Sequence, residues 1–309
     1  MGFPEKRRLA LVGAGGMLGR MIQALSPKDF AVYPLGHRRL DLTDHSSVAA
    51  AMEEVVPDVI INCAAYTNVD GAESDERTAF QVNGEGPALL ASAARKYSAT
   101  LVHISTDFVF DGKNSSPYLE EDKPGPLSVY GCSKLQGEIE VIKSGLEKYF
   151  IIRTSWLFGP GGKNFVETIS RLAREREELR IVADQWGTPT YTEDLAGAIF
   201  NLLALEKRTH QEGCPYGLYH FSNQGACSWY EFACEIVSLL KKNGRPLKVK
   251  RIVPIATEDF PLPARRPSYS VLCKQKYISA TGADVPLWTE SLHKYFLIQK
   301  NAGTCQTQG

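Results

Sequence analysis

The fold of the chain is decided by residues 8–19, which read RLALVGAGGMLG. The apolar run stops at Gly13, and Met21, Ile22 and Leu25 then recur at the spacing of one helix face. This order predicts a buried strand, a glycine turn and a helix.

Three glycines of this turn, Gly13, Gly16 and Gly19, recur at every third position. Gly13 can make the tight turn, Gly16 lets the backbone approach a pyrophosphate, and Gly19 lets helix and sheet pack closely. The helix start then offers unbonded N–H groups and a partial positive charge to an anion. We therefore expect a dinucleotide site here rather than a structural turn that is merely rich in glycine. The loop residues expected at the cofactor are Gly13, Gly15, Gly16, Met17, Leu18 and Gly19.

The alternation of strand and helix continues through the first half of the chain. Further apolar runs read as strands at residues 30–35, 58–62, 100–105 and 149–153. Helical segments lie between them, at residues 46–56, at 74–97 with a break near 84–87, and after Leu127. Strands that are apolar on both faces and alternate with helices indicate a parallel sheet covered on both sides. The expected fold is α/β, a doubly wound parallel sheet of the Rossmann type with its ligand at the carboxyl ends of the strands.

The second half of the chain is less regular. Short strands are predicted at residues 179–182, 218–221 and 248–253, and helices at 164–176, 192–205 and 229–241. We expect the helix at 192–205 to pack back onto the sheet and the remainder to form a smaller, irregular C-terminal substrate domain. The expected division is therefore 1–158 plus about 190–212 for the dinucleotide-binding domain, about 159–189 plus 213–300 for the substrate domain, and 301–309 for a flexible tail.

Composition narrows the class of partner. The 309 residues suffice for about two domains, and 35 basic residues balance 35 acidic ones, so no overall charge recruits nucleic acid or an anionic membrane. The longest apolar runs fall far short of the roughly 20 residues that cross a bilayer. The seven cysteines are scattered without Cys-x-x-Cys spacing, and the six histidines lack ligand spacing. We expect a cytoplasmic protein with reduced thiols, no metal site, no nucleic-acid or membrane partner and a small-molecule substrate.

The end of the second strand selects the dinucleotide. NAD-binding proteins usually place an acidic residue there, whereas arginine accommodates the 2′-phosphate of NADP. Here the strand runs into Arg38 and Arg39, which favours NADPH and leaves NADH possible but less favoured. The alternative is that both arginines are solvated loop residues. Asp41 and Leu42, at the start of the next helical segment, are expected beside the adenine.

Proton chemistry is predicted from two further segments. Thr106 follows the fourth strand, and Tyr130 and Lys134 are four residues apart, on one face of a helix. A lysine ammonium beside a tyrosine is expected to lower the phenol pKa from its usual value of about 10. Thr106 can bond a substrate carbonyl, Tyr130 can protonate it as hydride arrives, and Lys134 can hold the nicotinamide ribose. Ordinary surface neighbours and a strand-end cap are the alternatives, but the position at the carboxyl end of the sheet favours catalysis.

These motifs carry a resemblance to a known family. Its specific stretches are residues 62–73, 105–112, 130–134, 153–156, 184–190 and 265–267. From the glycine loop to about Leu292 the chain resembles the extended short-chain dehydrogenases/reductases and, within them, the dTDP-4-dehydrorhamnose reductases. The resemblance implies that Thr106, Tyr130 and Lys134 are catalytic. It also implies that NADPH reduces the C4 ketone of a dTDP-4-keto-6-deoxy-L-sugar to dTDP-L-rhamnose.

The resemblance also assigns binding residues. Those implied at the cofactor are Ala64, Ala65, Tyr66, Asn83, Ser105 and Lys134. Those implied at the dTDP-sugar are Thr67, Val69, Asp107, Val109, Trp156 and Arg266. Arg266 is the candidate for the diphosphate because its forked guanidinium suits phosphate oxygens. A buried core aromatic and a surface cation are the alternatives for Trp156 and Arg266.

The chain departs from part of this family, and other functions share its fold. Some relatives dimerise through magnesium held by a carboxylate at a position where this chain has Met21, so we expect a monomer or a homodimer without a magnesium bridge. A related dehydratase needs a second acid after Asp107, where Phe108 stands. Another nucleotide-sugar reductase or an epimerase is the alternative with the same fold. A non-catalytic NADP-binding subunit, similar to the beta subunit of methionine adenosyltransferase, would carry serine in place of Thr106.

Overall fold

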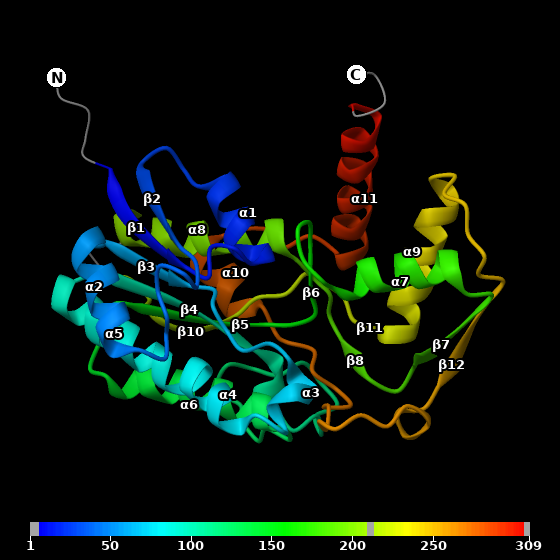
Figure 1. The fold of residues 1–309 in the computed structure, drawn as a ribbon, viewed down its shortest axis with the longest axis horizontal. Helices are drawn as coiled ribbons and strands as arrows, with labels where there is room; N and C mark the ends of the chain where they lie inside the picture. Colours follow the sequence, from blue (N-terminus) through cyan, green and yellow to red (C-terminus); the bar gives the residue numbers. More distant parts are fainter. Residues whose placement is uncertain (1–5, 209–212, 306–309) are drawn as a thin grey trace.

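The computed structural model describes residues 6–208 and 213–305. It is built around a six-stranded sheet (Figure 1). The strand order is β10-β5-β4-β3-β1-β2, and every neighbouring pair is parallel. The strands are β1 (Arg7–Val12), β2 (Phe30–Leu35), β3 (Val59–Asn62), β4 (Thr100–Thr106), β5 (Tyr149–Thr154) and β10 (Gly217–His220). The predicted doubly wound parallel sheet is confirmed. β1 and β3 are neighbours at the switch point, where such folds bind ligands.

Helices cover both faces of this sheet because each strand is apolar on both sides. Leu9 and Leu11 of β1 belong to the core beneath α1 (Met17–Leu25), α8 (Thr192–Arg208) and α10 (Gln275–Thr281). Ala10 and Val12 belong to the core beneath α2 (His45–Val55), α5 (Gly86–Tyr97) and α6 (Val129–Lys143). The expected packing of the helix at 192–205 onto the sheet is confirmed, since Leu195, Ile199 and Leu202 lie in the first of these cores.

The helical region at 74–97 is continuous where a break was expected. α4 (Glu76–Phe80) runs into a π-helical turn, η1 (Gln81–Glu85), and then into α5. Pro87, which has no N–H to donate, lies in α5 directly after this π-helical turn. A Cβ on Gly137 of α6 would lie 2.1 Å from the Asn83 carbonyl oxygen, so this π-turn packs directly on α6. π-turns of this kind are frequent at functional sites.

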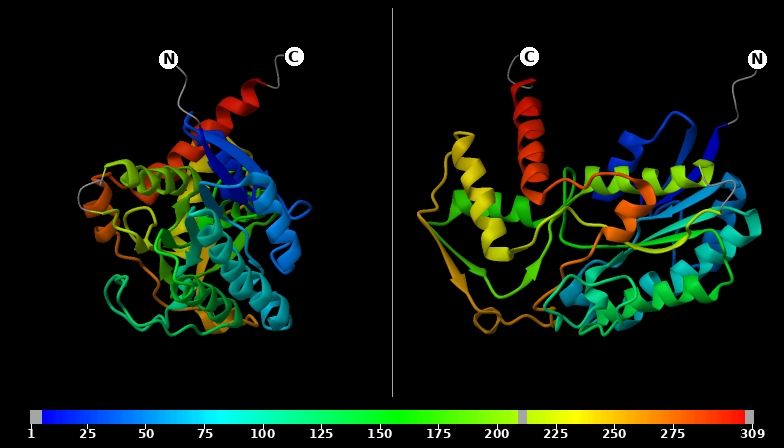
Figure 2. Two further views of the ribbon diagram at one scale, coloured as in Figure 1. Left: turned by 90° about the vertical axis from the view of Figure 1, so that its left-hand side faces the viewer. Right: turned by 180° about the vertical axis from the view of Figure 1, so that it is seen from behind.

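A smaller unit lies beside one end of the sheet, as Figure 1 and the right-hand view of Figure 2 show. Its strands pair as β6 (Leu157–Phe158) with β9 (Thr190–Tyr191), β7 (Glu178–Val182) with β12 (Arg251–Ile255), and β8 (Trp186–Gly187) with β11 (Cys227–Ser228). Its helices are α7 (Phe165–Glu175), α9 (Trp229–Lys242) and α11 (Trp288–Cys305). They enclose a separate core that includes Phe158, Phe232 and Tyr295. Short connecting helices are α3 (Val69–Ala72), η2 (Asp107–Val109) and η3 (Thr257–Asp259).

The boundary between the two units differs from the expected division. β10 was expected in the substrate domain, but it pairs in parallel with β5 and forms an edge of the central sheet. Tyr277 of α10 likewise packs into the core under α8. Residues 301–305 of the expected tail continue helix α11, while 306–309, and 209–212 at the expected domain boundary, lie outside the described residues. The local sequence pattern predicted the strand β10, but tertiary contacts determine which strand it pairs with.

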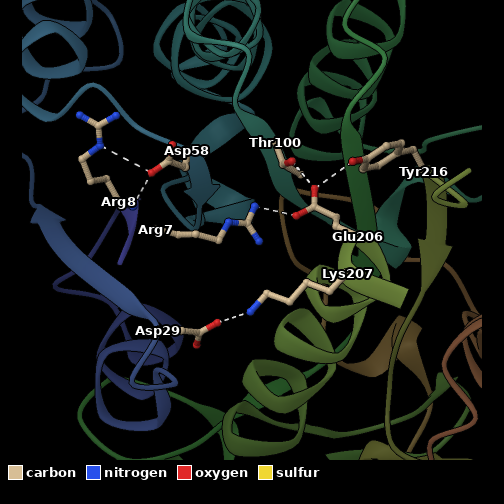
Figure 3. A network of polar contacts seen from close by, with 8 residues as sticks. All are labelled: Arg7, Arg8, Asp29, Asp58, Thr100, Glu206, Lys207 and Tyr216. Carbon is tan, nitrogen blue, oxygen red and sulfur yellow. Dashed lines mark hydrogen bonds and ion pairs between the residues drawn. The ribbon is translucent and has the colours of Figure 1, made fainter. Parts of the chain in front are cut away.

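A polar network joins elements at the amino end of the sheet (Figure 3). Glu206 of α8 accepts hydrogen bonds from Arg7 at 2.6 Å, from Tyr216 at 2.9 Å and from Thr100. These contacts tie β1, β4 and the start of β10 to one helix. Lys207 pairs with Asp29 nearby. Within the described residues, no helix combines the length and apolar character needed to span a membrane.

Candidate active site

The glycine turn after β1 is built so that only glycine fits at two positions. Gly13 has a φ of +77°, and a Cβ there would lie 2.5 Å from the Ala64 nitrogen. A Cβ on Gly19 would lie 2.5 Å from the Gly13 carbonyl oxygen. Gly16 precedes α1 and provides no side-chain cap, so the first N–H groups of this helix are left for an anion. The turn therefore fits the pyrophosphate of a dinucleotide.

The other residues predicted in this loop have different roles. Gly15 has nothing within 4 Å of the place where a Cβ would lie, so its lack of a side chain is not required by packing. The Leu18 side chain is buried in the core, which leaves only its backbone for a cofactor. The Met17 sulfur accepts a hydrogen bond from Asn164 Nδ2 at 3.4 Å, and this contact joins the turn to the smaller unit.

The segment after β2 separates the two arginines that were predicted together. Arg39 forms an ion pair with Glu54 at 2.6 Å on the surface. Arg38 is exposed and has no ion pair within the described part of the chain. The Asp41 carboxylate accepts hydrogen bonds from the backbone and hydroxyl of Thr43, which hold its pKa below the usual value, and Leu42 is buried. Of the two arginines, Arg38 is the better placed to receive a phosphate.

Asn83 holds the segment after β3 through hydrogen bonds to its backbone. The buried Asn83 side chain accepts a hydrogen bond from the Tyr66 nitrogen at 2.8 Å and donates one to the Tyr66 oxygen at 3.1 Å. Its amide also donates to Ser133 Oγ on α6 at 3.0 Å. Asn83 therefore fixes the backbone of the predicted cofactor segment, which includes Ala64 and Ala65, to α6, the helix of the predicted catalytic residues. Thr67 follows in an exposed position, and Val69 begins α3.

The predicted catalytic trio converges at the carboxyl end of β4. Lys134 is buried, and its Nζ donates a hydrogen bond to the Ile104 carbonyl at 2.7 Å. Thr106 Oγ1 donates to Asp107 Oδ1 at 3.1 Å and shares a side-chain hydrogen bond with Tyr130. Ser128 caps α6 by accepting from the Gly131 nitrogen, so the helix begins just before Tyr130. Strand end and helix start thus bring the three side chains together.

The electrostatics of Tyr130 differ from the expectation. Burial raises the phenol pKa to about 12, a hydrogen bond with Thr106 opposes this, and the charge of Asp107 adds to it. The prediction that Lys134 lowers the pKa of Tyr130 is therefore wrong for this structure. Burial also lowers the Lys134 pKa to about 8, and its amine points to the Ile104 carbonyl. Tyr130 is accordingly held in its protonated form at neutral pH.

Asp107 is the most unusual carboxyl group of the site. It is 1% exposed, and burial raises its pKa to about 6 against the opposing hydrogen bonds of Ser270 and Thr106. Its Oδ2 has no hydrogen-bond partner among the described residues. Val109, predicted at the substrate, has a fully buried side chain in a cluster with Phe110, which leaves only its backbone for a ligand.

Trp156 and Arg266, both predicted at the substrate, each contact another side chain of the protein. The Trp156 ring stacks on Trp229, with centroids 3.5 Å apart and an interplanar angle of 11°. Trp156 also has a φ of +47°, a strained value for a residue other than glycine. Arg266 makes a two-pronged ion pair with Asp70, with nitrogen to oxygen distances of 3.1 and 2.8 Å. The segment that carries Arg266 therefore lies against α3, next to Val69.

Several residues that shape the site were not assigned a role from the sequence. Asp70 and Ser270 act on Arg266 and Asp107 from distant parts of the chain, and no local spacing could have paired them. Glu138 is different, since it follows Lys134 by four residues on the same helix face and contacts the strand end through Ser105. That spacing was a usable signal.

Comparison with known proteins agrees with this geometry. The family model described as RmlD substrate binding domain matches residues 7–300. A dTDP-4-dehydrorhamnose reductase from Burkholderia thailandensis is 42% identical over 284 residues, which cover 91% of this chain and 95% of that protein. The structure of dTDP-4-dehydrorhamnose reductase from Bacillus anthracis, in complex with NADP, is 42% identical and covers 94% of this chain and 99% of that chain, with a TM-score of 0.86. The structure of the Clostridium acetobutylicum protein of the same name gives the same identity, coverage and TM-score. The chain belongs to the RmlD substrate binding domain family and is a relative of the dTDP-4-dehydrorhamnose reductases, as its motifs indicated.

Proposed function

We propose that the protein is an NADPH-dependent dTDP-4-dehydrorhamnose reductase. It reduces the C4 ketone of a dTDP-4-keto-6-deoxy-L-sugar and completes the synthesis of dTDP-L-rhamnose. The observation that carries the proposal is the convergence of Thr106, Tyr130 and Lys134 at the carboxyl end of a sheet whose first turn fits a pyrophosphate. The family and its reductase relatives support the same reaction.

Each catalytic side chain has a role that follows from its contacts. Tyr130 donates a proton to the ketone oxygen, and its raised pKa keeps that proton available at neutral pH. The Thr106 hydroxyl, held between Tyr130 and Asp107, orients the same oxygen. Lys134, anchored to the Ile104 carbonyl, holds the nicotinamide ribose. Bound NADPH would supply the hydride.

The substrate residues come from segments that the Asp70–Arg266 ion pair joins. Thr67 and Val69 flank this pair on one side, and Asp107 lies under the segment through its hydrogen bond with Ser270. We therefore infer that Thr67, Val69, Asp107 and Trp156 border the sugar. Arg266 binds the diphosphate by exchanging the carboxylate of Asp70 for phosphate oxygens, which the same fork can grip.

The reaction is tested by NADPH consumption with the dTDP-4-keto sugar, generated in situ by upstream enzymes, and by identifying the sugar product. Formation of dTDP-L-rhamnose with equimolar loss of NADPH is the expected result. Binding of NADPH without turnover would favour a non-catalytic subunit, and turnover of the sugar without net loss of NADPH would favour an epimerase or a dehydratase.

Cofactor choice is tested by comparing Arg38→Ala with Arg39→Ala. We expect Arg38→Ala to lower the preference for NADPH over NADH by about tenfold, the value of one charged hydrogen bond. Arg39→Ala should keep the preference, since this guanidinium is paired with Glu54. An unchanged preference in the double variant would remove both arginines from phosphate recognition.

Oligomeric state remains a prediction. The Met21 side chain packs against the core under α8 and offers no carboxylate. We infer a monomer or a homodimer without a magnesium bridge. Mass measured by light scattering should therefore be the same with magnesium and with a chelator, and a chelator-dependent change would contradict the inference.

A further inference from the structure

A row of buried polar side chains crosses the sheet behind the catalytic trio. Ser105 on β4 is the register partner of Arg153 on β5, and Arg153 is the partner of His220 on β10. Glu138 of α6 contacts both Ser105 and Arg153. All four side chains are at most 3% exposed. Buried charges of this kind need close partners, so their geometry is tightly set.

Glu138 is gripped from two directions. Arg153 donates to it from Nε at 3.0 Å and from a terminal nitrogen at 2.7 Å, and the Ser105 hydroxyl donates to the same carboxylate. The other side of Arg153 faces His220 Nε2 at 3.5 Å. His220 Nδ1 lies 3.1 Å from the Tyr118 carbonyl, which can only accept, so Nδ1 carries the proton and Nε2 faces the guanidinium as an acceptor.

The Arg153 guanidinium is also covered on its face. Its Cζ lies 5.0 Å from the centre of the Phe110 ring, within the range of a cation–π contact. Burial and the charge of Arg153 lower the His220 pKa to about 3, so the imidazole stays neutral. Arg153 is thus fixed by a carboxylate, an imidazole and an aromatic ring, and it fixes Glu138 in turn.

This carboxylate reaches the catalytic groups through one residue. Ser105 stands between Ile104, whose carbonyl binds Lys134 Nζ at 2.7 Å, and Thr106, whose hydroxyl contacts Tyr130. A shift of Ser105 would therefore move the anchor of Lys134 and the hydroxyl of Thr106 together. Buried ion pairs add little net stability, so stability alone is a weak account of this arrangement.

We propose that Glu138 is a positioning residue for the reduction, which holds the end of β4 through Ser105 and so sets Thr106 and Lys134 in place. This inference rests on the proposed function. Glu138 also faces Lys134 electrostatically: the titratable groups around the lysine amine are Glu138, Cys63 and His103. Burial lowers the Lys134 pKa to about 8, and the charge of Glu138 opposes that fall, which helps to keep the lysine protonated at neutral pH.

The test compares Glu138→Gln with Glu140→Gln on the same helix. Glu140 accepts a hydrogen bond from Gln136 and is the matched control. We expect Glu138→Gln to lower kcat about ten- to a hundredfold with the KM for the sugar unchanged, because small misplacements of reacting groups are costly. As pH rises, the activity of Glu138→Gln should also begin to fall at a lower pH than that of the wild type. The reason is that Lys134 loses its proton more easily without the charge of the carboxylate. Glu140→Gln should match the wild type in both measurements.

Ser105→Ala provides a second variant, in case the uncompensated Arg153 prevents Glu138→Gln from folding. It removes the link to β4 and leaves the ion pair intact, and we expect a loss of kcat of about fivefold. Wild-type kcat in folded Ser105→Ala, or wild-type kcat and pH profile in folded Glu138→Gln, would overturn the positioning role. A wild-type protein that consumes no NADPH would instead contradict the proposed function.

Discussion

At the amino end of the central sheet, the Glu206 carboxylate receives hydrogen bonds from three side chains (Figure 3), whereas at the carboxyl end Asp107 Oδ2 has no partner among the described residues. Glu206 lies on α8, which packs on the central sheet, and Asp107 directly follows β4 of that sheet. Both carboxyl groups are largely buried. None of the residues drawn in Figure 3 carries a buried polar atom without a partner in the described part of the chain.

The difference between the two ends separates charged groups that stabilise the fold from charged groups that are available for function. At the amino end each of the three carboxylates in Figure 3 meets a cation, and the hydrogen bonds to Glu206 offset the cost of burying it. At the carboxyl end, burial shifts the pKa of Tyr130, Lys134 and Asp107 and leaves hydrogen-bonding capacity for a ligand. The polar residues around Glu206 satisfy one another and hold the fold, whereas the carboxyl group of Asp107 is left incomplete at the site.

The largest expected effect comes from removing one phenol oxygen at each end. Tyr130→Phe should lower kcat for NADPH-dependent reduction by about 10²–10⁴-fold, because the proton donor is lost. Tyr216→Phe should leave kcat unchanged and lower the free energy of unfolding by about 0.5–1.5 kcal/mol, since it loses one hydrogen bond to Glu206. Steady-state kinetics and urea unfolding measure the two outcomes. Full turnover in Tyr130→Phe would break the comparison.

The next effect concerns the pH dependence of stability at Asp107. Its pKa is raised from the ordinary value of 3.8 to about 6 in the folded protein, so between these values the folded state holds a proton that the unfolded chain has lost. Stability from this group is therefore present at low pH and falls as pH rises through about 4 to 6. Relative to Asp107→Asn, the free energy of unfolding of the wild type should fall by about 3 kcal/mol over this window. Urea unfolding at several pH values measures the difference.

Asp111→Asn is the control with the opposite sign. Hydrogen bonds from Lys113 and Tyr118 lower the Asp111 pKa, so its contribution is present above the unfolded pKa and is lost as pH falls. The stability gap between wild type and variant should therefore change with pH in opposite directions for the two positions. Parallel changes would show that Asp107 is not specially desolvated.

The smallest expected effects concern the polar network at the amino end of the sheet. Glu206→Gln should lower the free energy of unfolding by about 1–3 kcal/mol, because the new amide group faces donors from Arg7 or Tyr216. Asp29→Asn, which breaks an exposed pair with Lys207, should cost at most about 1 kcal/mol. Neither variant should change kcat, measured after correction for folded protein. A selective loss of kcat would mean that the two ends are coupled.

Much of the fold was predictable because the information is local. Apolar runs such as Val59–Asn62 and the glycine turn at Gly13 fix a buried strand and its ligand loop within a few residues. The trio followed for the same reason, since Tyr130 and Lys134 share one helix face. Helix α11 was not predicted, although Leu292, Tyr295 and Phe296 recur at helical spacing and are buried.

What escaped prediction depends on contacts between distant segments. Arg266 meets Asp70 across 196 positions of sequence, and β10 joins β5 only after the chain has passed through the first part of the smaller unit. The raised pKa of Tyr130 also escaped, because it depends on burial rather than on the spacing to Lys134. Motifs indicate which groups can react, but the exclusion of solvent determines the pKa of each group.

The place of β10 at the edge of the sheet has a consequence for biogenesis. The strand spans residues 217–220 of a chain of 309, so the sheet stays incomplete until more than two thirds of the protein has been synthesised. Until then the far side of β5 presents unpaired backbone groups, the kind of edge that promotes association between chains. The closing contact is also long-range in sequence, which slows folding. Until residues 217–220 are made, pairing of β5 with another chain can therefore compete with the native contact.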